Sequence, residues 1–173
     1  MSHSLHIFDL DGTLTETWEA TILSGVADRV SALKGHLAVA TNQAGVGWHA
    51  VEGEPYPRAS EVGTRLVKVA EAVPRLKDAL WLVAIGDERV ALTEKRWQGL
   101  AEALVRAAAP LQVRVSSDLS WRKPRPGMLL KACEAFDVRR GAAICVGDHQ
   151  TDAEAAEAAG VDFVDADRYF GRA

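Results

Sequence analysis

The sequence predicts an α/β protein in which a mostly parallel, doubly wound sheet lies between two layers of helices. Three observations lead to this expectation. Short apolar runs alternate with longer segments of helical periodicity along the whole chain. Some of these runs end in polar, glycine-containing turns, as at 7–14 and 142–152, which is typical of strands that deliver side chains to the carboxyl edge of a parallel sheet. Apolar residues make up 48% of the 173, enough for a buried core without disulfides.

The expected elements follow in chain order. Apolar runs predict strands at 5–9, 36–40, 80–85, 112–116, 142–146 and 161–164. Segments of helical periodicity predict helices at 18–33, 59–73, 93–108, 126–136 and 151–159. Thr15 or Thr17 is expected to cap the first helix. The Gly- and Pro-rich stretch 45–57 is expected to be an irregular loop, and His6 is expected to face outward from its strand.

Composition and charge narrow the class of protein. The net charge of −4 provides no overall attraction to nucleic acid or to an anionic membrane. Cys133 and Cys145 lie in a predicted helix and a predicted strand, so we expect small core residues rather than a disulfide or a metal site. The sequence shows neither a secretory signal pattern nor an apolar run of membrane-spanning length. We therefore expect a single cytoplasmic domain over residues 1–173 that does not engage membranes.

Two carboxylates follow the first predicted strand, in the stretch Ile7-Phe8-Asp9-Leu10-Asp11-Gly12-Thr13-Leu14. Alternate residues of an extended chain point to the same side, so Asp9 and Asp11 can share one site. Gly12 allows a sharp turn and a close approach of the backbone to a ligand. Adjacent carboxylates repel each other unless a cation or a shared proton lies between them, so this arrangement predicts a metal ion.

Three further segments have the same character. The strand at 36–40 ends in Thr41-Asn42-Gln43, and the strand at 142–146 ends in Gly147-Asp148-His149-Gln150-Thr151-Asp152. Between them, Trp121-Arg122-Lys123-Pro124 places a lysine in a proline-rich loop just before a helix. Because an open α/β sheet gathers its ligand-binding groups at the carboxyl ends of its strands, these segments are expected to converge there.

In order along the chain, the four segments resemble the signatures of the haloacid dehalogenase-like (HAD) phosphohydrolase superfamily. Those signatures are an Asp-x-Asp-Gly-Thr loop, a Thr or Ser after the second strand, a Lys, and a Gly-Asp-x-x-x-Asp loop. Here they run from Asp9 to Asp152, most of the chain. The resemblance implies a HAD-like, Rossmannoid fold and a phosphatase. Asp9 would be the nucleophile that forms an aspartyl-phosphate, while Asp11 would protonate the leaving alcohol and later deprotonate the attacking water.

The resemblance also implies which groups bind the phosphoryl group. Phosphoryl transfer spreads negative charge over the equatorial oxygens, so positive charge and hydrogen-bond donors have to surround it. Lys123 would supply a point charge, Thr41 a hydroxyl, and the segment at Asn42 a further donor.

A divalent cation is the expected cofactor. Asp9 and Asp148 would bind a hard, oxygen-seeking ion, for which Mg²⁺ is the natural choice, and the resemblance adds the backbone carbonyl of Asp11 as a ligand. Asp152 lies four residues after Asp148, in the first turn of a predicted helix. There it would orient metal-bound water or Lys123.

Two motifs narrow the resemblance to one branch. Thr41–Gly47 and Arg122–Met128 are similar to histidinol-phosphate phosphatases, heptose bisphosphate phosphatases and polynucleotide 3′-phosphatases, which have a small cap or none. The metabolite phosphatases of this branch often carry a zinc loop with cysteines, yet residues 1–132 contain no cysteine. The stretches 110–115 and 121–124 are closer to the polynucleotide 3′-phosphatases, whereas the acidic net charge argues against a nucleic-acid track.

Several alternatives stay open at this point. An insert is expected within 48–118, either at 48–92 or at 86–118. The expected substrate is a small phosphorylated metabolite of the sugar-phosphate or histidinol-phosphate type, and the alternative is a nucleic-acid end with a 3′-phosphate. A phospho-accepting receiver and a catalytically silent binding module are more distant alternatives. Asp11 argues against the receiver, because a general acid/base beside the nucleophile promotes turnover. The sequence does not indicate an oligomeric state.

Overall fold

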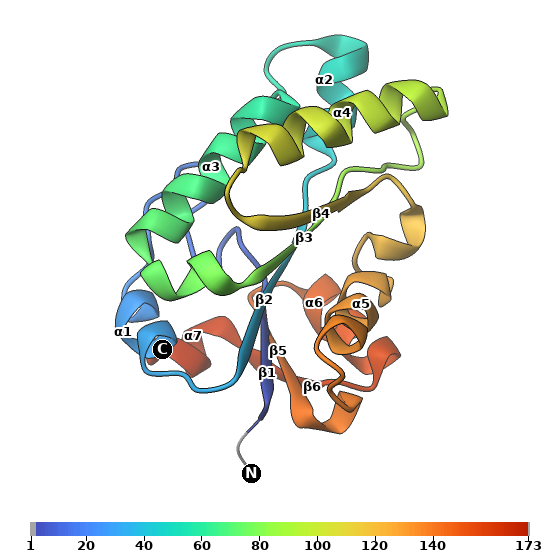
Figure 1. Ribbon diagram of the computed structural model, residues 1–173. Coiled ribbons are helices and arrows are strands. Elements are labelled where there is room, and N and C mark those ends of the chain that lie inside the picture. The colour runs from blue at the N-terminus through green and yellow to red at the C-terminus, as the bar shows by residue number, and fades with distance from the viewer. Residues whose placement is uncertain (1–2, 173) are drawn as a thin grey trace.

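The computed structural model describes residues 3–172, in which six parallel strands form one sheet (Figure 1). The strands are β1 (Leu5–Phe8), β2 (His36–Asn42), β3 (Leu80–Ala84), β4 (Gln112–Ser116), β5 (Ala143–Gly147) and β6 (Asp162–Asp165). They lie in the order β4-β3-β2-β1-β5-β6, and each neighbouring pair is parallel. The predicted α/β class with a doubly wound parallel sheet is confirmed.

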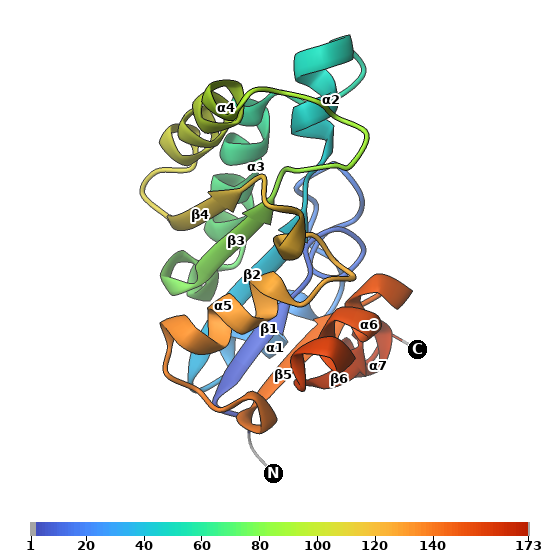
Figure 2. The same ribbon diagram turned by 90° about the vertical axis from the view of Figure 1, so that its right-hand side faces the viewer.

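Helices cover both faces of this sheet. They are α1 (Val26–Ser31), α2 (Gly45–Glu52), α3 (Ala59–Ala72), α4 (Glu94–Ala107), α5 (Gly127–Ala135), α6 (Gln150–Ala159) and α7 (Ala166–Phe170). Helices α1, α3, α4 and α7 pack on one face, and α5 and α6 pack on the other (Figures 1 and 2). None of the helices described is long and apolar enough to cross a membrane.

Strand β1 is buried on both faces, as the central strand of a three-layer protein has to be. Leu5 and Ile7 belong to the core beneath α5 and α6, whereas Phe8 belongs to the core beneath α1, α3 and α7. This alternation is the two-residue period of a strand. Because β1 lies inside the sheet, between β2 and β5, the residue after Phe8 emerges in the interior of the carboxyl edge.

The connections of the chain reverse direction at β1. From β1 the sheet grows through β2, β3 and β4 to one side, and β5 and β6 then extend it on the other side. Strands β1 and β5 are therefore neighbours whose following segments diverge, which opens a crevice where α/β proteins bind ligands. The backbone N–H of Asp9 donates to the carbonyl of Val146 over 2.9 Å, which holds the two strand ends together.

The prediction of a helix over 18–33 was wrong in its first half, because only α1 is helical there. Thr15 instead forms isolated β-bridges with Asp11 and Ile22, and the N–H of Leu23 donates to the carbonyl of Leu14. Neither Thr15 nor Thr17 caps α1, because the residue that precedes this helix is Gly25. Residues 13–25 therefore fold back over the end of β1 as a hairpin-like flap. Contacts with residues distant in the sequence stabilise this flap.

The prediction of an irregular loop over 45–57 was also wrong in part, since α2 occupies its first eight residues. Its glycines are required for packing. A Cβ on Gly45 would lie 2.8 Å from Pro57, and one on Gly47 would lie 2.5 Å from the ring of Trp97. Helix α2 and its flanking loops lie beyond the carboxyl ends of the strands (Figure 1).

The remaining elements agree with expectation to within about two residues, with two further exceptions. His6 is buried rather than outward-facing, at 8% exposure, and helix α7 was not anticipated. Cys133 and Cys145 are free and buried, as predicted. The expected insert region 48–118 contributes α3, β3, α4 and β4; the limits of an insert stay a prediction.

Candidate active site

A buried ion cluster lies at the carboxyl edge of the sheet, in the crevice between β1 and β5. The ammonium of Lys123 is 2.5 Å from Oδ1 of Asp9 and 2.5 Å from Oδ1 of Asp152. These side chains come from the end of β1, from the loop before α5 and from the first turn of α6. All three are nearly inaccessible, with Asp9 at 8% exposure and Asp152 at 1%. Buried charges of this kind are tolerated only when they are paired.

Asp148 completes a group of three carboxylates. Carboxylate oxygens of Asp9, Asp148 and Asp152 all lie within 4.8 Å of one another, and Asp148 is exposed. The hydroxyl of Thr13 donates to Oδ1 of Asp148 over 3.1 Å. Gly12 has a φ of 80°, which favours glycine, and a Cβ on it would collide with the Asp148 carboxylate. The Asp-Gly-Thr turn thus leaves room for Asp148 and orients it.

The cluster holds more negative than positive charge, because three carboxylates face one ammonium. Burial raises the pKa of Asp9 to about 6, against the opposing pull of Lys123, and the nearby Asp152 raises it further. Burial alone would lower the pKa of Lys123, but the two carboxylates outweigh it and raise that pKa above its ordinary value. Lys123 is therefore a permanent cation, and the oxygen donors around it suit an additional hard cation.

Asp11 lies outside this cluster and has its own partners. Its side chain is 38% exposed. Gln43 donates from Nε2 to Oδ2 of Asp11 over 2.9 Å and approaches Oγ1 of Thr41 at 3.0 Å. Arg65, from α3, donates to Oδ1 of Asp11 over 2.5 Å. Both oxygens of this carboxylate are thus held by side chains from other elements.

The side chain of Asn42 has a structural role beside the phosphate-binding donor predicted for this segment. Its side-chain amide donates to the carbonyl of Lys123 and accepts from the N–H of Lys123, both over 3.0 Å. This pair of bonds ties the end of β2 to the loop that carries the lysine. The side chain of Asn42 therefore sets where the Lys123 ammonium lies, and Thr41 is the residue of this segment whose hydroxyl faces Gln43.

Three residues that contribute to the site were not among those predicted from the sequence. They are Thr13, Gln43 and Arg65. Thr13 and Gln43 lie inside recognised motifs, each within two residues of a predicted site residue, so their position in the sequence carried a signal. Arg65 is 54 residues from Asp11 in the chain, in the middle of an amphipathic helix, and only its buried position distinguishes it.

The chain is similar in sequence to known hydrolases and phosphatases. A model of the haloacid dehalogenase-like hydrolases matches residues 102–166. A D-glycero-alpha-D-manno-heptose-1,7-bisphosphate 7-phosphatase from Burkholderia mallei is 29% identical over 154 residues, which is 87% of this chain and 69% of that protein. The family model therefore matches part of the chain, whereas the similarity to the heptose bisphosphate phosphatase extends over most of it. A phosphoglycolate phosphatase from Nitrosospira multiformis is 37% identical over 93 residues, 51% of this chain; the match spans only 41% of that relative.

Solved structures show the same HAD-like fold. A protein described as a HAD-like phosphatase from Mesorhizobium loti superposes with a TM-score of 0.64 at 19% identity, over 92% of this chain and 70% of that one. The D,D-heptose 1,7-bisphosphate phosphatase from B. bronchiseptica, solved with magnesium and phosphate, gives a TM-score of 0.50 at 19% identity. It covers 94% of this chain and 79% of that structure.

Proposed function

We propose that this protein is a Mg²⁺-dependent phosphatase that hydrolyses phosphate monoesters through an aspartyl-phosphate. The observation that supports it most is the buried contact of Asp9 with Lys123 at the carboxyl edge of the sheet, with Asp148 and Asp152 beside it. A carboxylate held against a fixed ammonium is suited to attack phosphorus while the ammonium balances the charge of the phosphoryl oxygens.

In the first step, Asp9 attacks the phosphorus atom. Lys123 contacts Oδ1 of Asp9, so Oδ2 is the oxygen left to form the new bond. As that bond forms, the bond from phosphorus to the leaving alcohol breaks, and Asp11 transfers a proton to the departing oxygen. In the second step Asp11 takes a proton from water, which attacks phosphorus and restores the Asp9 carboxylate. Thr41, Lys123 and the backbone amide at Asn42 donate hydrogen bonds to the phosphoryl oxygens.

The residues present fit a bound Mg²⁺. The three carboxylates carry more charge than Lys123 balances, and all offer oxygen, the donor that Mg²⁺ prefers. Asp9 and Asp148 would hold the ion, together with the backbone carbonyl of Asp11. Asp152 would act through Lys123, which it contacts directly. When bound, the ion supplies positive charge that offsets the negative charge of the transferring phosphoryl group.

The proposed substrate is a small phosphorylated metabolite of the sugar-phosphate or histidinol-phosphate type. The named relatives are a phosphoglycolate phosphatase and a heptose bisphosphate 7-phosphatase, both of which act on small phosphorylated molecules according to their names. An acidic protein with a net charge of −4 also lacks an overall attraction for a nucleic-acid chain. These two observations favour the metabolite over the nucleic-acid end, and a panel of substrates tests the choice.

The test is phosphate release from a panel of esters with Mg²⁺ present. The panel holds histidinol phosphate, sugar mono- and bisphosphates, phosphoglycolate, nucleotides and an oligonucleotide with a 3′-phosphate. We expect turnover of at least one small ester, and no turnover by Asp9→Asn, which keeps the side-chain volume but removes the nucleophile. Selective release from the oligonucleotide would instead identify a nucleic-acid end-processing enzyme. Turnover by Asp9→Asn near the wild-type rate would contradict the nucleophile assignment.

A further inference from the structure

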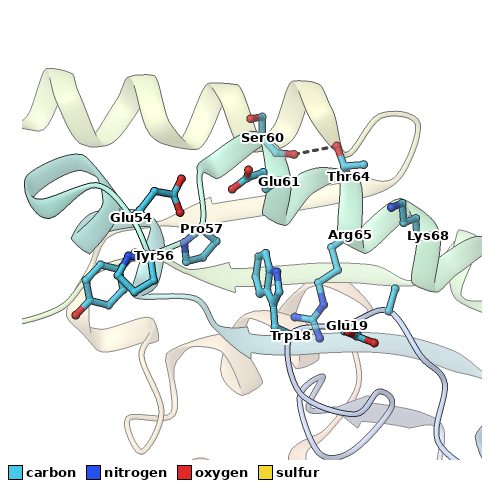
Figure 3. A pocket seen from close by; sticks show the side chains of 12 residues that line it. Trp18, Glu19, Glu54, Tyr56, Pro57, Ser60, Glu61, Thr64, Arg65 and Lys68 are labelled. Carbon is cyan, nitrogen blue, oxygen red and sulfur yellow. Dashed lines mark hydrogen bonds between the residues drawn. The ribbon is translucent and has the colours of Figure 1, made fainter.

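Arg65 is a deeply buried arginine beside the site, and one of its nitrogens carries all of its hydrogen bonds to the described residues. Its side chain is 5% exposed. Nη2 lies 2.5 Å from Oδ1 of Asp11, 2.8 Å from Oγ1 of Thr15 and 2.5 Å from the carbonyl of Thr17. The ring of Trp18 covers the guanidinium, with its centroid 5.2 Å from Cζ. Figure 3 shows Arg65 projecting from α3 toward the flap that carries Trp18.

Contacts with the flap do not by themselves explain why this side chain is charged. Nε and Nη1 of Arg65 are both buried without a hydrogen-bond partner among residues 3–172. An unsatisfied buried donor is destabilising, and a well-packed apolar side chain in place of a buried charge is often neutral or stabilising. Two of the three acceptors of Nη2 belong to Thr15 and Thr17 and could be served by a neutral donor, whereas the third is the Asp11 carboxylate. The cluster of contacts on Nη2 therefore points to the Asp11 carboxylate as the reason for the charge.

The two carboxylate oxygens of Asp11 have different hydrogen-bond partners. A guanidinium is only a donor, so Oδ1, which faces Arg65, has to remain an acceptor. Oδ2 faces Gln43. The amide nitrogen of Gln43 also contacts Oγ1 of Thr41, and so it keeps a partner when Oδ2 is engaged elsewhere. Oδ2 is thus the oxygen that is free to exchange a proton.

We propose that Arg65 is a positioning residue, which fixes the Asp11 carboxyl group so that Oδ2 delivers the proton to the leaving oxygen and later takes one from water. This inference rests on the proposed function, in which Asp11 is the acid and base. In the first step the bond from phosphorus to the leaving oxygen breaks, its electron pair takes the proton from Oδ2, and Asp9 forms the new bond to phosphorus. In this role Arg65 acts through Asp11 and needs no contact with the substrate.

The test compares two leaving groups in wild type and in Arg65→Met. An alkyl phosphate from the panel needs a proton on its leaving oxygen, whereas nitrophenolate leaves without one. Because kcat/KM covers the steps up to formation of the aspartyl-phosphate, we expect Arg65→Met to lower it by about 10² for the alkyl phosphate and by less than about threefold for nitrophenyl phosphate. The kcat for nitrophenyl phosphate should still fall, because hydrolysis of the intermediate needs Asp11 as a base.

Because formation of the aspartyl-phosphate from nitrophenyl phosphate stays fast while its hydrolysis slows, Arg65→Met should show a burst of nitrophenol release. A structural defect would not produce such a burst. Arg65→Met mixed with nitrophenyl phosphate should release about one equivalent of nitrophenol rapidly and then turn over slowly.

A second variant, Arg65→Ala, should regain alkyl phosphate hydrolysis on addition of guanidinium ion. The ion has a route in, since Arg65 lines a cavity of about 840 Å³ between α3, the flap and the loop after α2 (Figure 3). The matched control is Lys68→Met, one helical turn away on the same cavity, which should change kcat/KM by less than about twofold.

The outcomes separate this inference from the function on which it rests. If wild type releases phosphate from no ester, the proposed function fails and Arg65 is not at issue. If wild type is active and Arg65→Met loses kcat/KM equally for both leaving groups, or for neither, the positioning role is overturned. A midpoint of thermal unfolding for Arg65→Met well above the assay temperature excludes unfolding as the cause of lost activity.

Discussion

Strand β1 buries one titratable side chain near each end, and the surroundings of the two differ in kind. His6, near its amino end, and Asp9, just after its carboxyl end, are both 8% exposed. Burial moves each toward its neutral form, lowering the pKa of His6 to about 4 and raising that of Asp9 to about 6. Asp9, however, has an ammonium 2.5 Å away, whereas Nδ1 of His6 has no hydrogen-bond partner in the part of the chain that the structure describes.

The two ends of β1 differ in the charges that surround the buried side chain. Around His6 lie other positively charged or titratable groups, with His3 beside it, Arg29 from α1 and Tyr169 from α7, so a protonated imidazole gains nothing there. Around Asp9 the opposite charge comes from a loop 114 residues away. Charge is thus concentrated at the carboxyl edge, where the strand ends converge, and is disfavoured at the amino end of β1. The same strand serves packing at one end and the proposed chemistry at the other.

Removing the countercharge should have the largest effect on stability. In Lys123→Met, Asp9 and Asp152 remain buried beside each other without their ammonium, and breaking a buried pair in this way costs about 3–5 kcal/mol. Urea unfolding in the presence of EDTA measures the loss. Lys68→Met, which removes an exposed lysine, is the control. Adding Asp152→Asn to Lys123→Met should recover part of the loss; an unchanged midpoint in Lys123→Met would contradict the account of the cluster.

A divalent cation bound at the carboxyl end of β1 should stabilise the protein even when no substrate is present. A ligand that binds only the folded state at about 100 times its Kd contributes about 2.7 kcal/mol, so Mg²⁺ should raise the midpoint of thermal unfolding. Asp148→Asn removes one proposed ligand and should abolish most of this rise. Asp78→Asn, whose side chain is 82% exposed in a different region, should leave it unchanged. A wild-type midpoint that does not respond to millimolar Mg²⁺ would count against the proposed metal site.

The amino end should show a smaller effect that depends on pH. The pKa of His6 is lowered from 6.5 to about 4 in the folded state, so between these values the unfolded chain binds a proton that the folded chain does not. Stability from this group is therefore complete above about pH 6.5 and is lost progressively as pH falls toward 4. Urea unfolding at several pH values should show a shallower decline in His6→Leu. Parallel curves for the two proteins would refute the prediction.

The polar groups at the strand ends were accessible to prediction because they are local in sequence. Asp9, Asp11 and Asp148 each follow an apolar run closely, and a parallel sheet brings such positions to one edge. The sequence pattern did not reveal which cationic side chain pairs with each carboxylate. Asp11 and Asp9 are two residues apart, yet Lys123 pairs with Asp9 and Arg65 with Asp11. Spacing predicts proximity but does not determine which cation each carboxylate meets.

The sequence predictions that were wrong have a common physical origin in long-range packing. The flap over 13–25 is held by contacts with Arg65, and α2 closes against Pro57 and Trp97, so the local helix and loop signals were overridden there. His6 was misplaced because both faces of a central parallel strand are covered. By itself, then, the sequence determined the order of the strands, of the helices apart from α2 and α7, and of the residues at the strand ends, since periodicity and turn residues act locally. Only the tertiary structure decided the flap, the burial of His6 and the hold of Arg65 on Asp11, because those depend on surfaces that meet only after the sheet has formed.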